Sequence, residues 1–239
     1  PPSPNLYLDV NSKKITLYWQ NNAEDFLDPI SQEVDFEGYR IYGSRKTDNQ
    51  SLGEFSLLLQ QIDLDNELGY NTGFSSVQII DEFGEQDSVL INGVFYHYKF
   101  ENFNVKDGWL NYYSITAYDQ GDPDANLESL ESSIFANRLY VYPGKTIEDG
   151  SNWAGEPTVY PNPYRGQALW DDNSSRGKMV WFRNLPQEAE IRIFSLAGDL
   201  VDIIDHNDSY NGQDIQNIDS QKNPIMSGGE HAWDMITMY

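Results

Sequence analysis

The stretch ITLYWQ, residues 15–20, alternates apolar side chains with polar or amphipathic ones. In an extended chain Ile15, Leu17 and Trp19 point to one side, and the residues between them point to the other. Alternation of this kind over a short run is typical of a β-strand with one buried face. We therefore expect a strand here that packs Trp19 into a hydrophobic core.

Similar short runs, separated by turn-forming residues, recur along the first 142 residues. Aromatic residues make up 14% of the chain, and aromatic and β-branched side chains fill a pleated sheet surface well, so the composition also favours strands. We expect an all-β protein. The expected strands are residues 6–10, 15–19, 39–44, 55–61, 77–80, 95–103, 112–118 and 134–142, with loops at 21–35 and 61–77.

Three motifs in this part carry a family resemblance: ITLYWQ, GYRIYGS at residues 38–44 and NYYSITAYD at residues 111–119. In this order and spacing they resemble a fibronectin type III domain covering residues 1–142. The resemblance implies that the tryptophan of the second strand packs across the core against tyrosines of the facing sheet. The side chains expected in this core are Trp19, Tyr39, Tyr42, Tyr113 and Ile115.

The sequence departs from that family at one position. The usual pattern has a tyrosine at residue 111, whose hydroxyl would tie the strand to the preceding loop, but this chain has Asn111. Tyr112 or Tyr113 could supply the hydroxyl only after a shift of register, which would turn side chains to the opposite face.

Residues 143–157 are small, polar or helix- and strand-breaking, and they indicate a linker between two domains. The motif VYPNPYRG, residues 159–166, follows the linker. Proline lacks an amide donor and fixes φ, so Pro161 and Pro163 suit an edge strand that leads into a rigid bend. We expect this motif to begin a second sandwich and to keep its edge from pairing with another chain.

Residues 178–186 (KMVWFRNLP) and 189–204 (AEIRIFSLAGDLVDII) predict a short β-meander with a tight turn at Gly198. With VYPNPYRG before them and GEHAWDM at 229–235 after them, they resemble the C-terminal Ig-like sorting domains of type IX secretion cargo and the Ig-like domain of flagellar hook-capping proteins. This resemblance covers residues 158–239. It implies further strands after the Trp-Asp pair, so we expect a domain that is incomplete at its C-terminal end, or completed by a partner strand. Together, the two resemblances imply two tandem Ig-like or fibronectin type III-like β-sandwiches.

The charge is strongly acidic, with 38 Asp and Glu against 15 Lys and Arg and a formal net charge of −23. Nucleic acids and anionic membrane surfaces bind clustered Lys and Arg, so these partners are not expected. The chain has no cysteine, which excludes disulfides and thiolate metal sites. It also has no apolar run of the ~18 residues that a membrane-spanning helix needs.

No catalytic motif is recognisable in the sequence, and we do not expect an enzyme. The histidines, His97, His206 and His231, are expected on separate strands or loops without metal-binding spacing, and His97 is expected to face solvent. No organic cofactor is implied.

The best chemical candidate is the segment AYDQGDPDANLES, which carries Asp119, Asp122, Asp124 and Glu128. Calcium takes six to eight oxygen ligands on a flexible loop, and four carboxylates with main-chain carbonyls could supply them. The alternative is that Asp and Gly are ordinary turn formers here, with Asp122 and Asp124 in Asx turns. A second, weaker acidic cluster consists of Asp63, Asp65 and Glu67.

The resemblances imply a non-catalytic, extracellular structural or interaction module near the C-terminus of an exported bacterial protein. It would act as a spacer or adhesion surface and as a secretion or surface-anchoring domain, with secretion machinery or neighbouring subunits as protein partners. Accessory domains of a secreted hydrolase, or a subunit of an extracellular assembly, are the alternatives. Carbohydrate is a further candidate ligand, because Trp109, Trp153 and Trp170 lie in or beside expected loops.

Overall fold

The computed structural model describes residues 1–29, 32–45, 57–121, 128–145, 147, 153, 155–165, 179–212 and 225–235. Within these ranges the regular structure is entirely β, with strands joined by turns and loops. The strands form several antiparallel sheets. The expected all-β class is therefore confirmed.

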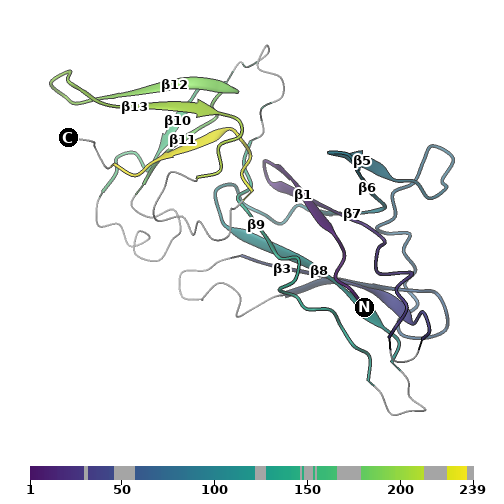
Figure 1. The fold of residues 1–239 in the computed structure, drawn as a ribbon. Coiled ribbons are helices and arrows are strands. Elements are labelled where there is room, and N and C mark those ends of the chain that lie inside the picture. Colours follow the sequence, from purple (N-terminus) through teal and green to yellow (C-terminus); the bar gives the residue numbers. More distant parts are fainter. Residues whose placement is uncertain are drawn as a thin grey trace.

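Two antiparallel sheets form the N-terminal part of the fold (Figure 1). The first has the order β1-β2-β7, with β1 Leu6–Asn11, β2 Lys14–Trp19 and β7 Tyr98–Asn102. The second has the order β4-β3-β8-β9, with β4 Leu57–Asp63, β3 Phe36–Arg45, β8 Asn111–Asp119 and β9 Leu139–Val141. A short hairpin of β5 (Val89–Ile91) and β6 (Val94–Tyr96) precedes β7.

The core lies between these two sheets and is centred on Trp19. The indole is fully buried, stacks on Tyr98 with ring centroids 5.4 Å apart, and meets the edge of Tyr39 at 5.9 Å. Because Tyr39 belongs to the facing sheet, this contact joins the two layers. Tyr113 and Ile115 are also buried, so four of the five expected core residues are confirmed.

The fifth expected core residue, Tyr42, was wrongly assigned. Tyr39 and Ile41 point into the core, and the period of two along a strand then turns Tyr42 to the outer face. There its side chain is half-buried, and its hydroxyl donates a hydrogen bond to Glu131 Oε1 at 2.8 Å. Glu131 also accepts hydrogen bonds from Arg40 and from the Thr116 hydroxyl, so Tyr42 belongs to a polar network.

The loop tie expected from a tyrosine is supplied by the asparagine itself. Asn111 is buried, and its Nδ2 donates to the carbonyl oxygen of Trp109 at 2.7 Å, which fixes the start of β8 to the preceding loop. The Tyr113 hydroxyl instead accepts a hydrogen bond from Asn102 Nδ2 at 2.9 Å, at the end of β7. No shift of register is needed.

Several expected strands differ from the structure in extent. Residues 77–80 make only isolated bridges, at Gln78 and Ile80, because the chain turns at 74–77. The expected strand 95–103 is interrupted at His97 and forms β6 and β7, and the expected strand 134–142 is reduced to β9. The first two residues of the expected strand 55–61 lie outside the described residues, and the strand extends to Asp63.

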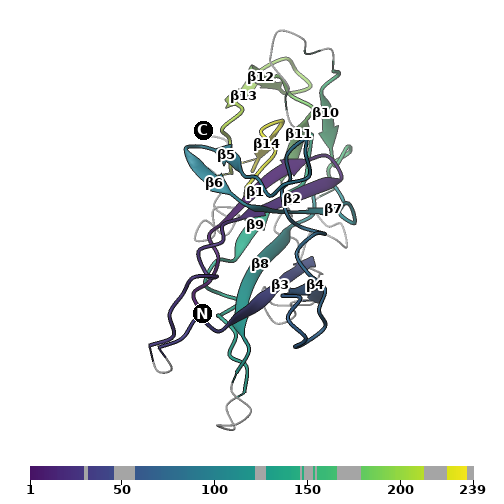
Figure 2. The same ribbon diagram turned by 90° about the vertical axis from the view of Figure 1, so that its right-hand side faces the viewer.

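The remaining strands form a second group (Figures 1 and 2). One sheet has the order β10-β11-β14, with β10 Thr158–Tyr160, β11 Val180–Arg183 and β14 Glu230–Trp233. β12 (Glu188–Phe194) and β13 (Leu200–Asn207) form a hairpin that turns at Gly198, as expected. β10 is an edge strand, so the VYPNPYRG motif begins this group at a sheet edge. The peptide bonds before Pro161 and Pro163 are both cis.

The two groups are joined by main-chain hydrogen bonds as well as by the connecting chain. The amide of Ile225 donates to the carbonyl of Tyr140 at 2.7 Å, and the amide of Tyr142 donates to the carbonyl of Ile225 at 2.8 Å. Ile225 therefore continues the β9 edge, and its side chain packs against the first core. Trp181 of β11 is fully buried, with its ring 6.5 Å from that of Tyr142.

Candidate functional site

Asp119, the first residue of the predicted calcium loop, is used to close that loop. It ends β8 and is buried, and its Oδ1 accepts hydrogen bonds from the amides of Gly121 at 3.1 Å and Leu130 at 2.7 Å. Its carbonyl oxygen accepts a further bond from the Ser129 hydroxyl at 2.6 Å. The bond from the Gly121 amide forms an Asx turn at Asp119. The Asx turns expected as the alternative, at Asp122 and Asp124, lie outside the described residues.

Of the other three predicted ligands, the structure describes only Glu128. Asp122 and Asp124 lie outside the described residues, and Glu128 is exposed. Among the described residues, no three His, Asp or Glu side chains come together in a metal-binding group.

The second acidic cluster is divided between core and solvent. Asp65 and Glu67 are exposed, whereas Asp63 is fully buried at the end of β4. Its carboxylate accepts hydrogen bonds from the Tyr70 amide at 2.6 Å, the Thr72 amide at 2.7 Å and the Thr72 hydroxyl at 2.9 Å. Burial alone would raise the pKa of Asp63, but these hydrogen bonds favour the charged form and lower it overall.

A third buried carboxylate, Glu37, was not predicted. It is 4% exposed at the start of β3, and its Oε2 accepts a hydrogen bond from Asn66 Nδ2 at 2.9 Å. Its Oε1 is buried without a hydrogen-bond partner. Nothing in the sequence around Glu37 marks it for burial, because a single acidic residue beside a glycine is typical of a turn.

His206 of β13 and His231 of β14 lie on separate strands, as expected, but the fold brings their side chains together. Both are buried, and their Nδ1 atoms lie 3.2 Å apart. The Tyr210 ring stacks on His231 with centroids 3.7 Å apart. Burial, and then the neighbouring His231, lower the pKa of His206 to about 4, so this ring is neutral at pH 7. One Nδ1 atom of the pair then donates and the other accepts.

The third histidine, His97, is only partly in solvent. It is half-buried, and its Nδ1 is buried without a hydrogen-bond partner. The expectation of a solvent-facing strand residue is therefore wrong, because His97 occupies the break between β6 and β7.

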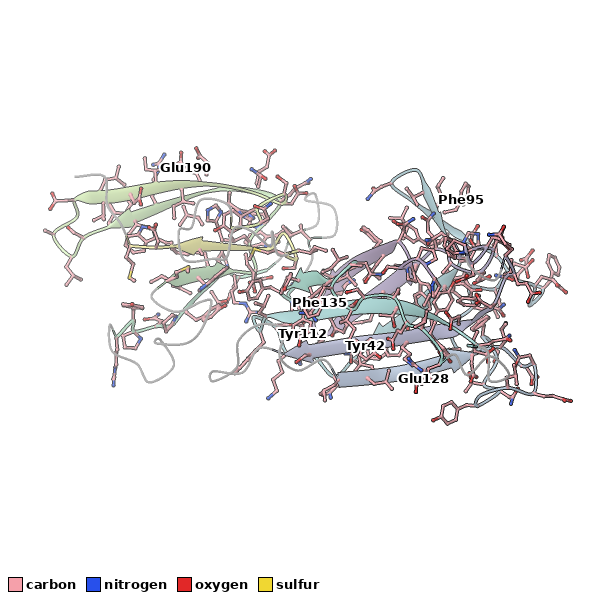
Figure 3. All side chains as sticks on the ribbon, turned by 60° about the horizontal axis from the view of Figure 1, so that its bottom comes forward. Tyr42, Phe95, Tyr112, Glu128, Phe135 and Glu190 are labelled. Carbon is pink, nitrogen blue, oxygen red and sulfur yellow. The ribbon has the colours of Figure 1, made fainter. Side chains whose placement is uncertain are left out.

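Aromatic side chains gather on the outer face of the β1-β2-β7 sheet. Tyr7 and Tyr18 lie opposite each other on neighbouring strands, and Tyr96 contacts both, with ring centroids between 5.9 and 6.4 Å. Phe95, the neighbour of Tyr96 in the β5-β6 hairpin, is 55% exposed (Figure 3). This cluster was not predicted, although the alternation along β2 places Tyr18 on the face opposite to the core.

Two of the three tryptophans named as sugar-stacking candidates lie in the described part of the chain. Trp109 is 43% exposed. Trp153 is half-buried with its Nε1 atom inside the protein, and Trp170 lies outside the described residues.

No family model matches the chain, and no curated protein matches it. Among solved structures, the chain is similar to part of Astrotactin-2, a vertebrate-specific, perforin-like membrane protein involved in neuronal development. That match has 12% identity, covers 62% of this chain and 23% of the other, and has a TM-score of 0.34.

At a TM-score of 0.34 the likeness to Astrotactin-2 supports no inference about this chain. The described elements also include no helix that is long and apolar enough to cross a membrane.

Proposed function

We propose that the chain is a non-catalytic, rigid spacer and interaction module of an exported bacterial protein, located outside the cell or on its outer-membrane surface. The first sandwich would act as a fibronectin type III-like spacer or adhesion surface, and the second as a type IX secretion or surface-anchoring domain. The observation that supports the spacer role best is the main-chain pairing between the two groups of strands.

This pairing is built around Ile225 and the end of β9. Ile225 exchanges main-chain hydrogen bonds with Tyr140 and Tyr142. Val141, between these two tyrosines, is fully buried and forms the parallel bridge to Ile225. A strand-like pairing of this kind resists bending, because any hinge motion between the groups would break its hydrogen bonds.

An ion pair adds a second point of attachment. The Arg183 guanidinium of the second group lies 2.7 Å from Glu230 and 3.7 Å from Asp107 of the first group. The side chains of Arg183 and Asp107 are 29% and 19% exposed, so this contact between the groups is less screened by solvent than a fully exposed surface pair. The two groups are therefore held together by contacts of different chemistry.

Two further observations support the family part of the proposal. Trp19 meets Tyr39 of the facing sheet, which is the contact that the fibronectin type III resemblance implies. β10 leads into Pro161 and Pro163 at the edge of its sheet, as expected for the first strand of the sorting-type domain.

Calcium binding by the loop after Asp119 also stays a proposal, with weaker support because that carboxylate already accepts two main-chain hydrogen bonds.

The secretion part is tested by fusing the whole chain behind a periplasmic reporter enzyme in a bacterium with a type IX system. We expect the reporter at the cell surface or in the medium, and its retention in the periplasm of a secretion-deficient strain. A fusion carrying Trp181→Ala is the matched control and should be exported less, because the change removes a fully buried side chain of the second unit. Equal export of the reporter in the type IX-competent strain and in the secretion-deficient strain would refute the secretion role.

A role as an assembly subunit is favoured by one feature of the second group of strands. In the described part of the chain β12 and β13 pair only with each other, so both outer edges of this hairpin are unpaired there. The hairpin carries Phe194, Leu200 and Ile203, exposed by 55%, 42% and 48%. Open edges beside apolar side chains are suited to strand addition by a neighbouring subunit. Light scattering of the purified chain distinguishes a monomeric spacer from such an assembly.

A further inference from the structure

Glu37 and Asp63 are two buried carboxylates that share one end of the β4-β3-β8 sheet. Glu37 is 4% exposed and Asp63 is 0% exposed. Among the ion pairs of the described residues, none involves either carboxylate. Within that part of the chain, the two side chains therefore place negative charge inside the protein without a basic group in ion-pair contact.

The backbone brings these carboxylates together. β3 has a bulge between Phe36 and Gly38 where it pairs with β8, and Glu37 is the extra residue. Gly38 lies opposite Asp63 on β4, and a Cβ atom at Gly38 would come 2.2 Å from the carbonyl oxygen of Ile62. Only glycine permits this close approach, which sets the end of β4 beside Glu37.

The two carboxylates converge on Gly69, where a side chain would not fit. A Cβ atom built on Gly69 would lie 2.6 Å from Asp63 Oδ2 and 3.3 Å from Glu37 Oε1. Asp63 Oδ2 accepts the Tyr70 amide, and a carboxylate oxygen has a second lone pair that can bind another group. Glu37 Oε1 has no hydrogen-bond partner.

The two carboxylates differ in how their burial is compensated. Asp63 accepts three hydrogen bonds from Tyr70 and Thr72 of the loop that follows it, whereas the bond to Glu37 comes from Asn66 alone. A buried polar atom without a partner is rare and calls for a ligand, a water molecule or an ion. Since both facing atoms are carboxylate oxygens, the missing group must be positive or a hydrogen-bond donor.

We propose that Glu37 Oε1 and Asp63 Oδ2 together bind a hard divalent cation of the calcium class beside Gly69. Calcium is coordinated by carboxylate, carbonyl and water oxygens in a flexible shell, so two carboxylates with loop carbonyls and water can complete its coordination. The site differs from the loop at Asp119 that the sequence suggested. It is independent of the proposed secretion and spacer roles.

The test is a titration of the whole chain with calcium chloride by isothermal calorimetry, with thermal unfolding measured in parallel. Extracellular calcium modules bind with dissociation constants of about 10⁻⁴–10⁻³ M, so the titration should extend to about 10 mM. We expect one saturable site, a calcium-dependent rise in the melting temperature, and at least about tenfold weaker binding for Glu37→Gln. Magnesium, which prefers smaller and more rigid shells, should bind more weakly.

Glu82→Gln is the matched control, because it removes an exposed carboxylate outside both acidic clusters and should leave the affinity unchanged. Glu128→Gln separates this site from the proposed calcium loop after Asp119. If Glu37→Gln does not fold, anomalous scattering from a terbium-soaked crystal of the wild-type chain decides the matter. A peak bonded to Glu37 Oε1 and Asp63 Oδ2 supports the site. Binding lost in Glu128→Gln but retained in Glu37→Gln, or no saturable binding, or only a water molecule between the two oxygens, would overturn it.

Discussion

The buried pair of His206 and His231 should make the second unit sensitive to mild acid. Both rings are almost fully buried, and the Nδ1 contact of 3.2 Å needs one nitrogen to donate and the other to accept. When both rings carry a proton on each nitrogen, no acceptor is left between them. Tyr210, Asp208 and His231 are the titratable groups around His206, and the carboxylate of Asp208 only partly offsets the effect of burial.

The sign and size of the effect follow from the lowered pKa. Burial and His231 lower the pKa of His206 from 6.5 to about 4, so the unfolded chain binds this proton before the folded chain does. The stabilisation is complete above pH 6.5 and is lost as the pH falls from 6.5 to about 4. At ~1.4 kcal/mol per pKa unit, the free energy of unfolding should fall by up to about 3 kcal/mol. That is a large part of the ~5–15 kcal/mol typical of a domain.

The assay is urea unfolding between about pH 7.5 and pH 4.5, followed by tryptophan fluorescence. Many carboxylates also titrate near the lower end of this pH range. The informative quantity is therefore the change in the free energy of unfolding with pH, compared between the wild-type chain and His206→Gln. We expect the variant to lose less stability between about pH 6.5 and pH 5, by about 2 kcal/mol. If the free energy of unfolding falls equally with pH in the wild-type chain and in His206→Gln, the histidine pair does not cause the acid sensitivity.

Three further predictions concern the first unit, each measured by chemical denaturation at neutral pH. Trp19→Ala removes a fully buried ring and should cost about 3–5 kcal/mol, so a loss below about 1 kcal/mol would contradict the central position of this side chain. Glu131→Ala should cost about 1–3 kcal/mol because Arg40, Tyr42 and Thr116 lose their acceptor; Tyr42→Phe should then add almost nothing in that background. Gly38→Ala should cost about 1–3 kcal/mol because the added Cβ forces β3 and β4 apart. Gly84 has open space around it, so Gly84→Ala should cost only the backbone strain of its positive φ, about 1 kcal/mol.

Regular alternation made most strands of the fold predictable. The run at 15–20 became β2 with the expected face inward, because its register is determined by a strictly alternating apolar set. The prediction of a strand at 77–80 was wrong because Val77 is a buried residue of a turn. A buried apolar residue gives the same local sequence pattern in a turn as in a strand. The hairpin of β5 and β6 was missed, although Asn92 and Gly93 both have positive φ and form the Asn-Gly pair typical of a two-residue hairpin turn.

The sites were less predictable than the strands, because they depend on contacts between distant strands. Glu37 reaches Asp63 only through the bulge before Gly38 and the pairing of β3 with β4. His206 meets His231 although β13 and β14 belong to different sheets. Neither relation is encoded in a local spacing. Local spacing instead indicated the acidic run after Asp119, where the carboxylates are close in sequence.

The acidic surplus of the chain has a structural use that its composition does not reveal. Glu24 Oε1 accepts hydrogen bonds from the hydroxyls of Tyr39 at 2.9 Å and Tyr98 at 2.6 Å, one from each sheet. Burial and then Glu24 raise the pKa of Tyr39, so its hydroxyl keeps its proton and donates. Asp63 and Asp119 accept main-chain amides in the same way where β4 and β8 end. A loop returning from a strand end exposes N–H donors, and a short acidic side chain satisfies them. Part of the negative charge therefore closes the ends of the sandwich.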